Sequence, residues 1–524
     1  MNRTRLSLLV LGVLGGCGDD HGSMPADAHP DTGQSDAPAV DAPTGDVPRV
    51  EAAPCRFTMP SSLALVEGAD YVCGDLVVEE NRATHAGRIR VHYIRIKSTA
   101  TTGNATIYLD GGPGGDGSGI LNYAGFLGRP FLDGLLVDGD FLVISQRGTA
   151  LSVPYLDCQT DDCSDFGGVA DLASYNTAYN ADDVNDLRSV LGIAKLDLYG
   201  ISYGSRLGLE VLRRHGAHVR AAVIEGLVPS QVQWHAEIPR SAYGAITALN
   251  ASCADAGACG TTFGDLVAKF VTGVDALNAN PVDIDVQGST FPLDGYTYAS
   301  LVFQVMYSKS SYAYLPLVIS DVAVRRTDRI GSYLTSWFTS LSGRRGTARG
   351  LYYGVVCGEV FNPPDPNAVA TATAGVPQAY VDIFGGGFER VAETCATYPK
   401  GNLQASLSQP VTSAVRTLVS SGRLDPITPP SFATIAAATL SNSVVVVHAN
   451  SGHGATLQSA CGVQNLHAFL ADPTGTHDMT CAGTLSTSYV IPSGFASLPA
   501  FPIQQLRADL ALAPIVPPFQ RARR

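Results

Sequence analysis

Three residues, Ser202, Asp425 and His453, have the types that nucleophilic catalysis requires, and they follow one another along the chain as serine, acid and histidine. Ser202 lies in the stretch LDLYGISYGSRLG, where a short apolar run predicts a buried strand and the residues after Gly204 predict a helix. A serine on such a strained strand-to-helix turn stands clear of the backbone, because flanking glycines are too small to clash with it. Gly200 and Gly204 meet that need, so the sequence predicts Ser202 as a nucleophile.

The candidate acid and base follow two late apolar runs, 415–419 and 444–448, which we expect to be strands. Asp425 lies in the proline-rich turn GRLDPITPP, and His453 lies between glycines in NSGHG. A carboxylate held by a rigid turn can orient an imidazole, and that imidazole can take the proton of a serine. We therefore expect His453 to be the general base and Asp425 its orienting acid.

A glycine run, DGGPGG at 110–115, follows another apolar strand at 105–109. Glycines at the carboxyl end of a strand let backbone N–H groups point into a site, as stabilisation of a tetrahedral oxyanion requires. We expect one donor from Gly111 or Gly112 and the other from the N–H of Tyr203. A flexible connection and a phosphate-binding loop are the alternatives, but no G-K-[ST] follows the run and the glycine spacing does not fit a dinucleotide fold.

Strand and helix signals alternate along the first half of the chain. Strand-like runs occupy 76–79, 89–96, 105–109, 141–145, 196–199 and 221–227, and an amphipathic stretch at 179–191 predicts a crossover helix. This alternation predicts an α/β fold with a mostly parallel sheet and helices on both faces. Between about 228 and 401 the strand pattern lapses, and 239–250, 296–308 and 315–330 are typical of helices.

Three motifs carry a family resemblance: GGPGG after one strand, SQRGT after the next and GISYG after a third. In this order they resemble the alpha/beta-hydrolase fold, in particular the prolyl/tripeptidyl aminopeptidase-like serine peptidases. GRLDPITPP followed by GHG resembles the C-terminal segment of the tripeptidyl aminopeptidase (TAP) family, which implies that Asp425 and His453 are the acid and the base. Ser145 departs from this pattern, since Asp is usual there, as does Asp110, where related enzymes often carry His.

The resemblance also implies a mainly helical cap, inserted between late strands and covering the serine. Within it VCGE at 356–359 resembles a short cap motif of these peptidases. A partly desolvated carboxylate binds a cationic substrate terminus well. Glu359, with Glu225 behind it, is therefore our candidate for binding a substrate amino terminus, although most glutamates lie on a protein surface without such a role.

The N-terminus predicts export. Arg3 and Arg5 precede an apolar run at 6–14 that is too short to span a bilayer, and small residues follow it. LGGC at 14–17 resembles the bacterial lipobox, which implies lipidation of Cys17; a plain secretory signal with a chance cysteine is the alternative. Residues after Cys17 are mainly Asp, Ala, Pro and Gly, a composition that predicts a disordered tether.

We therefore divide the chain into a signal peptide (1–16), the lipobox cysteine and tether (17–53), a first part of the hydrolase core (54–228), a helical cap (229–405), a second part of the core (406–485) and a tail (486–524) to which we assign no function. An independently folded module is the alternative to a cap.

Ten cysteines remain when Cys17 is set aside, an even number that favours disulfides in an exported chain. Pairing sequence neighbours gives five short loops. A metal site is the alternative, but no C-x-x-C pair and no His-x-x-x-His spacing accompanies the cysteines.

With a net charge of −13 and no basic stripe, the chain is not expected to bind nucleic acid. We predict an exported, lipid-anchored serine hydrolase that needs no cofactor or metal and releases amino acids or short peptides from the amino termini of peptide substrates. An esterase of the same fold and a catalytically inactive surface binding protein are the alternatives.

Overall fold

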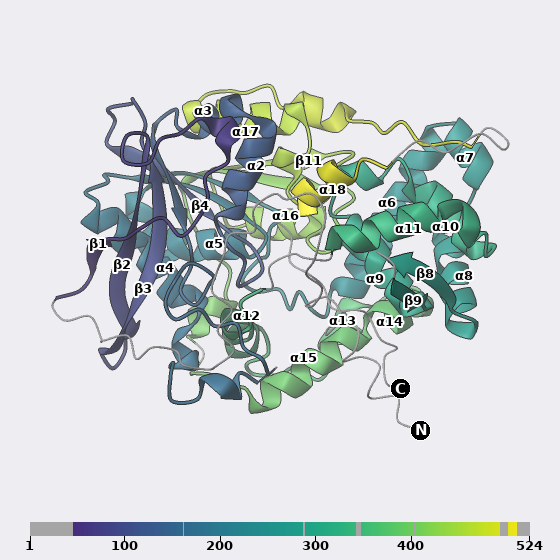
Figure 1. The fold of residues 1–524 in the computed structure, drawn as a ribbon, viewed down its shortest axis with the longest axis horizontal. Coiled ribbons are helices and arrows are strands. Elements are labelled where there is room, and N and C mark those ends of the chain that lie inside the picture. Colours follow the sequence, from purple (N-terminus) through teal and green to yellow (C-terminus); the bar gives the residue numbers. More distant parts are fainter. Residues whose placement is uncertain are drawn as a thin grey trace.

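A nine-stranded sheet organises the part of the chain that the computed structural model describes, residues 46–160, 162–286, 289–341, 347–402, 404–492 and 501–510. Its order is β1-β2-β3-β5-β4-β6-β7-β10-β11. The strands are β1 (Arg49–Ala52), β2 (Tyr71–Asn81), β3 (Ala86–Ile96), β4 (Asn104–Leu109), β5 (Gly139–Ile144), β6 (Leu196–Ile201), β7 (Val219–Glu225), β10 (Arg416–Gly422) and β11 (Ser443–His448). Figure 1 shows this sheet on one side and a helical region on the other.

Parallel pairing from β5 to β11 brings the predicted motifs to one edge of the sheet. Leu109 at the end of β4 pairs with Gly200, and Ile201 at the end of β6 pairs with Glu225. Glu225 in turn pairs with Ser420, and Gly422 at the end of β10 pairs with His448. Because the carboxyl ends of parallel strands lie at the same edge, the loops that follow β4, β6, β10 and β11 meet there. The strands β1, β2 and β3 pair antiparallel, so the sheet is mixed on that side.

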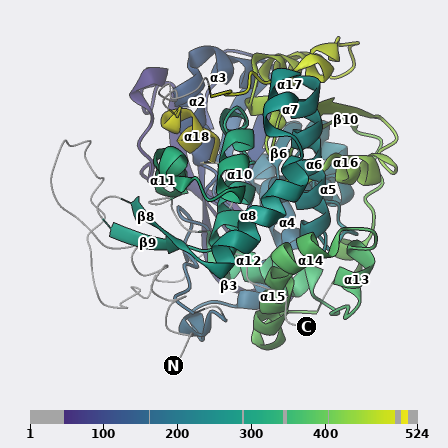
Figure 2. The same cartoon turned by 90° about the vertical axis from the view of Figure 1, so that its right-hand side faces the viewer.

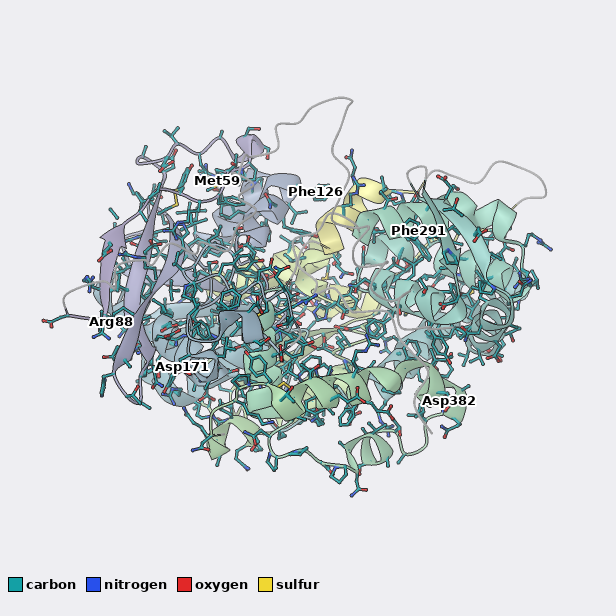
Figure 3. All side chains as sticks on the ribbon, turned by 60° about the horizontal axis from the view of Figure 1, so that its bottom comes forward. Met59, Arg88, Phe126, Asp171, Phe291 and Asp382 are labelled. Atoms are coloured by element: carbon teal, nitrogen blue, oxygen red, sulfur yellow. A yellow bond between two sulfur atoms is a disulfide. The ribbon has the colours of Figure 1, made fainter. Side chains whose placement is uncertain are left out.

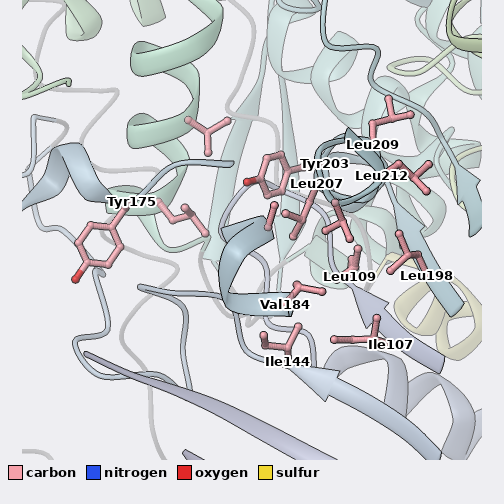
Figure 4. Close-up of a cluster of buried hydrophobic side chains, with 14 of the residues drawn as sticks. Ile107, Leu109, Ile144, Tyr175, Val184, Leu198, Tyr203, Leu207, Leu209 and Leu212 are labelled. Carbon is pink, nitrogen blue, oxygen red and sulfur yellow. The ribbon is translucent and has the colours of Figure 1, made fainter. Parts of the chain in front are cut away.

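Helices cover both faces of the sheet, as the alternating strand and helix pattern predicts. One face packs on α4 (Thr177–Val190), α5 (Tyr203–His215) and α16 (Pro430–Ala437), and the other on α2 (Gly119–Leu127), α3 (Arg129–Leu135) and α17 (Ala460–Ala471). Successive residues of β6 enter opposite cores, since Leu198 packs with the first set and Tyr199 with the second. Figure 4 shows the first of these cores, in which Leu207 of α5 lies near Leu109 and Leu198.

The region between β7 and β10 forms a mainly helical cap, most of which has a core of its own (Figure 2). Buried side chains at 351–361 and 395–398 instead join the core that α4 and α5 form on the sheet. Its elements are α6 (Ile238–Asp255), α7 (Ala258–Phe263), α8 (Leu266–Ala279), β8 (Val282–Val286), β9 (Ser289–Leu293), α9 (Gly295–Val305), η7 (Lys309–Ser311), α10 (Leu315–Ala323), α11 (Thr327–Leu341), α12 (Arg349–Val355), the π-helical turn η8 (Val356–Val360), α13 (Ala368–Ala372), α14 (Gln378–Phe384) and α15 (Gly386–Thr397). In Figure 3, Phe291 and Asp382 of the cap lie far from Arg88 of β3.

Two local predictions about the cap are wrong. The expected single helix at 315–330 is two helices, α10 and α11, because the chain turns at Arg325, whose φ of 58° lies in the left-handed region. The antiparallel pair β8–β9 interrupts the helices, and its alternation of apolar and polar residues, as in VDIDV, was the signal for it.

The predicted signal peptide, Cys17 and the tether up to residue 45 lie outside the described residues. The tether prediction extends too far, because β1 (Arg49–Ala52) pairs with β2 and so belongs to the sheet. In the predicted tail, the N–H of Val490 donates to the carbonyl of Ala313 at 2.8 Å. Leu506 of α18 (Ile503–Leu510) is fully buried in the core of the cap, so these parts of the tail pack on the cap.

The ten cysteines form disulfides, as their even number predicts, and the connectivity, which the sequence left open, joins neighbours along the chain. They join Cys55 to Cys73, Cys158 to Cys163, Cys253 to Cys259, Cys357 to Cys395, and Cys461 to Cys481. Disulfides persist in oxidising compartments, so they indicate an extracytoplasmic protein. In the described part of the chain, every helix is too short or too polar to cross a membrane.

Candidate active site

Ser202 occupies a strained turn between β6 and α5. Its φ of 59° and ψ of −126° are sparsely populated for a residue other than glycine. The flanking glycines are required by close packing: a Cβ on Gly200 would lie 2.4 Å from the carbonyl oxygen of Gly204, and one on Gly204 would lie 1.9 Å from that of Leu109. The N–H of Ser202 donates to the carbonyl of Glu225 at 3.0 Å, which fixes the turn to the end of β7. This is the elbow that the sequence predicts.

Asp425 and His453 form the expected acid–base pair. Nδ1 of His453 lies 2.8 Å from Oδ2 of Asp425, and both side chains are buried. The turn after β10 orients the carboxylate, because Oδ1 accepts hydrogen bonds from the N–H of Ile427 at 3.0 Å and from that of Thr428 at 2.9 Å. An Nδ1–H that donates to a carboxylate leaves Nε2 as an acceptor, which is the tautomer that a general base needs.

Thr428 is a part of this pair that sequence reasoning missed. Its hydroxyl donates to Oδ2 of Asp425 at 2.6 Å, and its oxygen lies 3.0 Å from Nδ1 of His453. The Thr428 hydroxyl thus contacts the same carboxylate oxygen and the same ring nitrogen that face each other in the Asp425–His453 pair. The signal was its place three residues after Asp425, where a Thr side chain can turn back toward the acid.

The imidazole lies beside the serine turn without a hydrogen bond to it. A Cβ on Gly226 would lie 3.0 Å from Cε1 of His453. Gly226 directly follows Glu225, whose carbonyl accepts the hydrogen bond from the N–H of Ser202. Within the described residues, Nε2 of His453 is buried and has no hydrogen-bond partner. Bonds between nucleophile and base are often long without substrate and tighten in its complex, so Nε2 can still accept the serine proton.

The glycine run after β4 packs against the nucleophile. A Cβ on Gly111 would lie 2.9 Å from Cβ of Ser202 and 3.4 Å from its Oγ, so only glycine fits there. The N–H of Gly115 donates to the carbonyl of Gly111 at 3.1 Å, and Gly112 has a φ of 111°. Tyr203 is the first residue of α5, and the first N–H groups of a helix have no partner within it. These amides are therefore the candidate oxyanion donors.

Glu359, our candidate for binding a substrate amino terminus, is engaged by other groups of the protein. Glu359 is 4% exposed on η8. Oε1 accepts from the N–H of Thr177 at 2.7 Å, and Oε2 accepts from the Thr177 hydroxyl at 2.8 Å. Arg206 of α5 donates to Oε2 through Nε and Nη2, both at 3.2 Å, and forms a buried ion pair. Through Thr177 and Arg206, Glu359 links the cap to α4 and α5.

Glu225 is not placed to meet an amino terminus either. Its side chain is fully buried, and burial raises the pKa of the carboxyl group. Oε2 accepts from the N–H of Thr456 at 2.8 Å, and Oε1 accepts from the hydroxyls of Thr456 and Tyr199 at 2.7 and 3.2 Å. Glu225 therefore braces the segment that follows His453.

Two other motif residues contact neighbouring parts of the core. Arg147 of SQRGT is fully buried and donates to both carboxylate oxygens of Asp183 at 2.7 Å, so it fastens its loop to α4. Asp110 accepts a hydrogen bond from the hydroxyl of Tyr108 at 2.9 Å. Among the described residues, no group of three or more His, Cys, Asp or Glu side chains is arranged to hold a metal ion.

Two family models match the chain, one ending early in the cap and the other beginning near its end. The model described as alpha/beta hydrolase fold matches residues 107–248, which include Ser202. The model described as TAP-like protein matches residues 382–481, which include Asp425 and His453. The chain is an alpha/beta hydrolase with a TAP-like C-terminal segment.

Relatives of this hydrolase carry names from two reaction classes. It is 25% identical over 368 residues to carboxylesterase B of Mycobacterium tuberculosis, a match that covers 60% of this chain and 68% of that protein. It is 28% identical over 159 residues to the proline iminopeptidase of Neisseria gonorrhoeae, which covers 29% of this chain and 43% of that protein. A solved thermophilic esterase from Thermogutta terrifontis aligns with a TM-score of 0.35 at 14% identity, covering 76% of this chain and 99% of that one.

Proposed function

We propose that this hydrolase cleaves acyl bonds through a covalent intermediate on Ser202. The observation that carries the proposal is the buried pair of Asp425 and His453, which leaves Nε2 without a partner among the described residues, beside a serine held on a strained turn. A nucleophile and a base whose tautomer is set by a carboxylate are the parts that acyl transfer needs.

The reaction would begin when Nε2 of His453 takes the proton of Ser202 as its Oγ attacks the substrate carbonyl. The amides of Tyr203 and of the Gly111–Gly112 run would stabilise the negative oxygen of the tetrahedral intermediate. The imidazolium, stabilised by Asp425, would then protonate the leaving group. Water, activated by the same imidazole, would release the acyl group and restore the serine.

For the substrate we propose a peptide with a free amino terminus, from which amino acids or short peptides are released. The TAP-like match supports this proposal because it includes both Asp425 and His453, and the similarity to a proline iminopeptidase supports it independently. We propose that a group other than Glu359 or Glu225 binds the amino terminus, since both of these carboxylates are engaged by the protein.

Hydrolysis of carboxylic esters is the second candidate. The engagement of Glu359 and Glu225 within the protein favours an esterase, because an uncharged ester has no ammonium group for a carboxylate to bind. The match to a protein named carboxylesterase B points the same way. The same triad cleaves esters and amides, so the substrate decides between the two activities.

A set of matched substrates tests the choice. We would compare kcat/KM for aminoacyl and tripeptidyl anilides, their N-acetylated counterparts and acyl esters of uncharged acids, with Ser202→Ala as the blank. An aminopeptidase cleaves the free anilides at least about tenfold faster than the acetylated ones, which corresponds to about 1.4 kcal/mol of recognition. Turnover of the uncharged esters alone would reject the peptidase and leave the esterase.

We also propose that the protein is exported and anchored by lipid on Cys17. The five disulfides support an oxidising compartment, and the lipobox resemblance supports the anchor. Cell fractionation of wild type and Cys17→Ala tests this. The anchored protein sediments with membranes and the variant does not, whereas equal distribution of the two would reject lipidation.

A further inference from the structure

The segment of the cap between α9 and η7 touches the loop of the candidate base directly. The N–H of His453 donates to the carbonyl of Tyr307 at 3.1 Å, and the two rings lie with centroids 4.8 Å apart. There is no space between the two segments, since a Cβ on Gly452 would lie 2.2 Å from the hydroxyl of Tyr312 and 2.4 Å from the carbonyl of Met306. Any movement of this part of the cap must therefore move the loop that carries the imidazole.

Gln458 joins the two segments with its whole amide group. Oε1 accepts from the N–H of Gly452 and from that of Lys309, both at 3.0 Å. Nε2 donates to the carbonyls of Tyr307, at 2.6 Å, and of His453. Two of these four groups belong to the histidine loop and two to the cap. Two N–H groups face one end of the amide and two carbonyls face the other, so its orientation is fixed.

We infer that Gln458 is a positioning residue for the proposed reaction, which sets the place of the His453 imidazole by locking its backbone to the cap. Asp425 and Thr428 fix the ring through Nδ1, but they do not fix the backbone on which the ring is carried. Gln458 and Tyr307 supply that second constraint at the N–H and the carbonyl of His453. The inference rests on the proposed function, because it concerns the base of that reaction.

The expected effect is on turnover rather than on substrate binding. Displacing a catalytic group by about 1 Å costs roughly 100-fold in rate. Gln458→Met keeps the approximate shape and removes all four hydrogen bonds, and Gln458→Glu keeps the acceptors but sets a carboxylate oxygen against two carbonyls. We expect both variants to lower kcat about 10- to 100-fold and to change KM less than about threefold.

Gln233 offers a matched control. Its Nε2 also joins two segments distant in sequence, donating from the chain after β7 to the carbonyl of Val360 at 2.6 Å, and neither segment belongs to the histidine loop. Gln233→Met should therefore keep kcat within about twofold of wild type, as expected when no catalytic geometry changes.

The experiment measures kcat and KM for wild type and the three variants, each normalised to the active sites titrated with a fluorophosphonate, with melting temperatures alongside. A purely structural role would lower the melting temperature of the Gln458 variants and leave kcat per titrated site at the wild-type value, which would overturn the inference. Ser202→Ala leaves Gln458 in place and separates failure of the proposed function from failure of the inference. Full activity in Ser202→Ala would overturn both. Loss of activity in Ser202→Ala, together with full activity in both Gln458 variants, would overturn the inference alone.

Discussion

The carboxylate of Asp425 lies 2.8 Å from Nδ1 of His453, at the opposite side of the ring from the nitrogen that would receive the serine proton. This relationship fixes the tautomer of the imidazole. Asp425→Asn would present an amide that can donate to Nδ1 and so favour the wrong tautomer. We expect kcat to fall about 10⁴-fold, as in other triads. Steady-state rates at pH 7 check this, and a variant with more than a tenth of the wild-type kcat would contradict the role of Asp425.

Thr428 should matter because its hydroxyl supports both members of that pair. Thr428→Val keeps the shape and removes the hydrogen bond to Oδ2. We expect kcat to fall about tenfold, since a hydrogen bond to a charged group contributes about 1.5–3 kcal/mol. Thr428→Ser retains the hydroxyl and should stay within about threefold of wild type. If the Val variant turns over as fast as the Ser variant, the hydroxyl has no part in positioning the base.

Glu359→Gln should destabilise the protein without changing how it recognises an amino terminus. The substitution leaves Arg206 buried without its counter-ion, and breaking a buried pair in this way costs about 3–5 kcal/mol. Urea unfolding measures that cost, with the exposed Glu67→Gln as the control, expected within about 0.5 kcal/mol of wild type. The ratio of kcat/KM between free and N-acetylated peptides should be unchanged. A selective loss on the free peptides would restore Glu359 as the amino-terminus site.

His235 should make stability depend on pH. Burial lowers the pKa of its imidazole to about 3, and its ring stacks on Trp234 with centroids 3.7 Å apart. Below about pH 6.5 the unfolded chain binds a proton at this residue that the folded protein does not, so stability falls as the pH drops from about 6.5 toward 3.

Between pH 7 and pH 4 this difference contributes about 3 kcal/mol to the loss of stability. His235→Phe keeps an aromatic ring and should lose less stability over that range, by about the same amount. Urea midpoints at the two pH values measure the effect, with the exposed His85→Phe as the control. Equal losses in wild type and His235→Phe would show that the ring is not kept neutral by burial.

Local pattern was sufficient to predict the strands that carry the site, because their side chains enter buried cores. Ser202 could be assigned from its glycine neighbours, since close packing against Leu109 excludes any larger residue. The order of Ser202, Asp425 and His453 then identified the partners, although they come from β10 and β11 on the far side of a long insertion.

The role of Glu359 could not be predicted from the sequence. Its partners Thr177 and Arg206 lie more than 150 residues away, and nothing in VCGE shows that they neutralise it. Gln458 was missed for a similar reason, because all four of its hydrogen bonds are to backbone groups, those of Tyr307, Lys309, Gly452 and His453, which do not depend on the side chains at those positions. Contacts of this kind follow from the packing of the cap on the core.

The most direct test of the account is covalent labelling of the nucleophile. The intact protein is treated with a fluorophosphonate at pH 7, digested and analysed by mass spectrometry, alongside Ser202→Ala and His453→Ala. The account predicts one adduct, on Ser202, in the wild type, none in Ser202→Ala, and labelling slowed at least about 100-fold in His453→Ala, since the base activates the serine. A folded wild-type protein that stays unlabelled, or that is labelled at another residue, would contradict it.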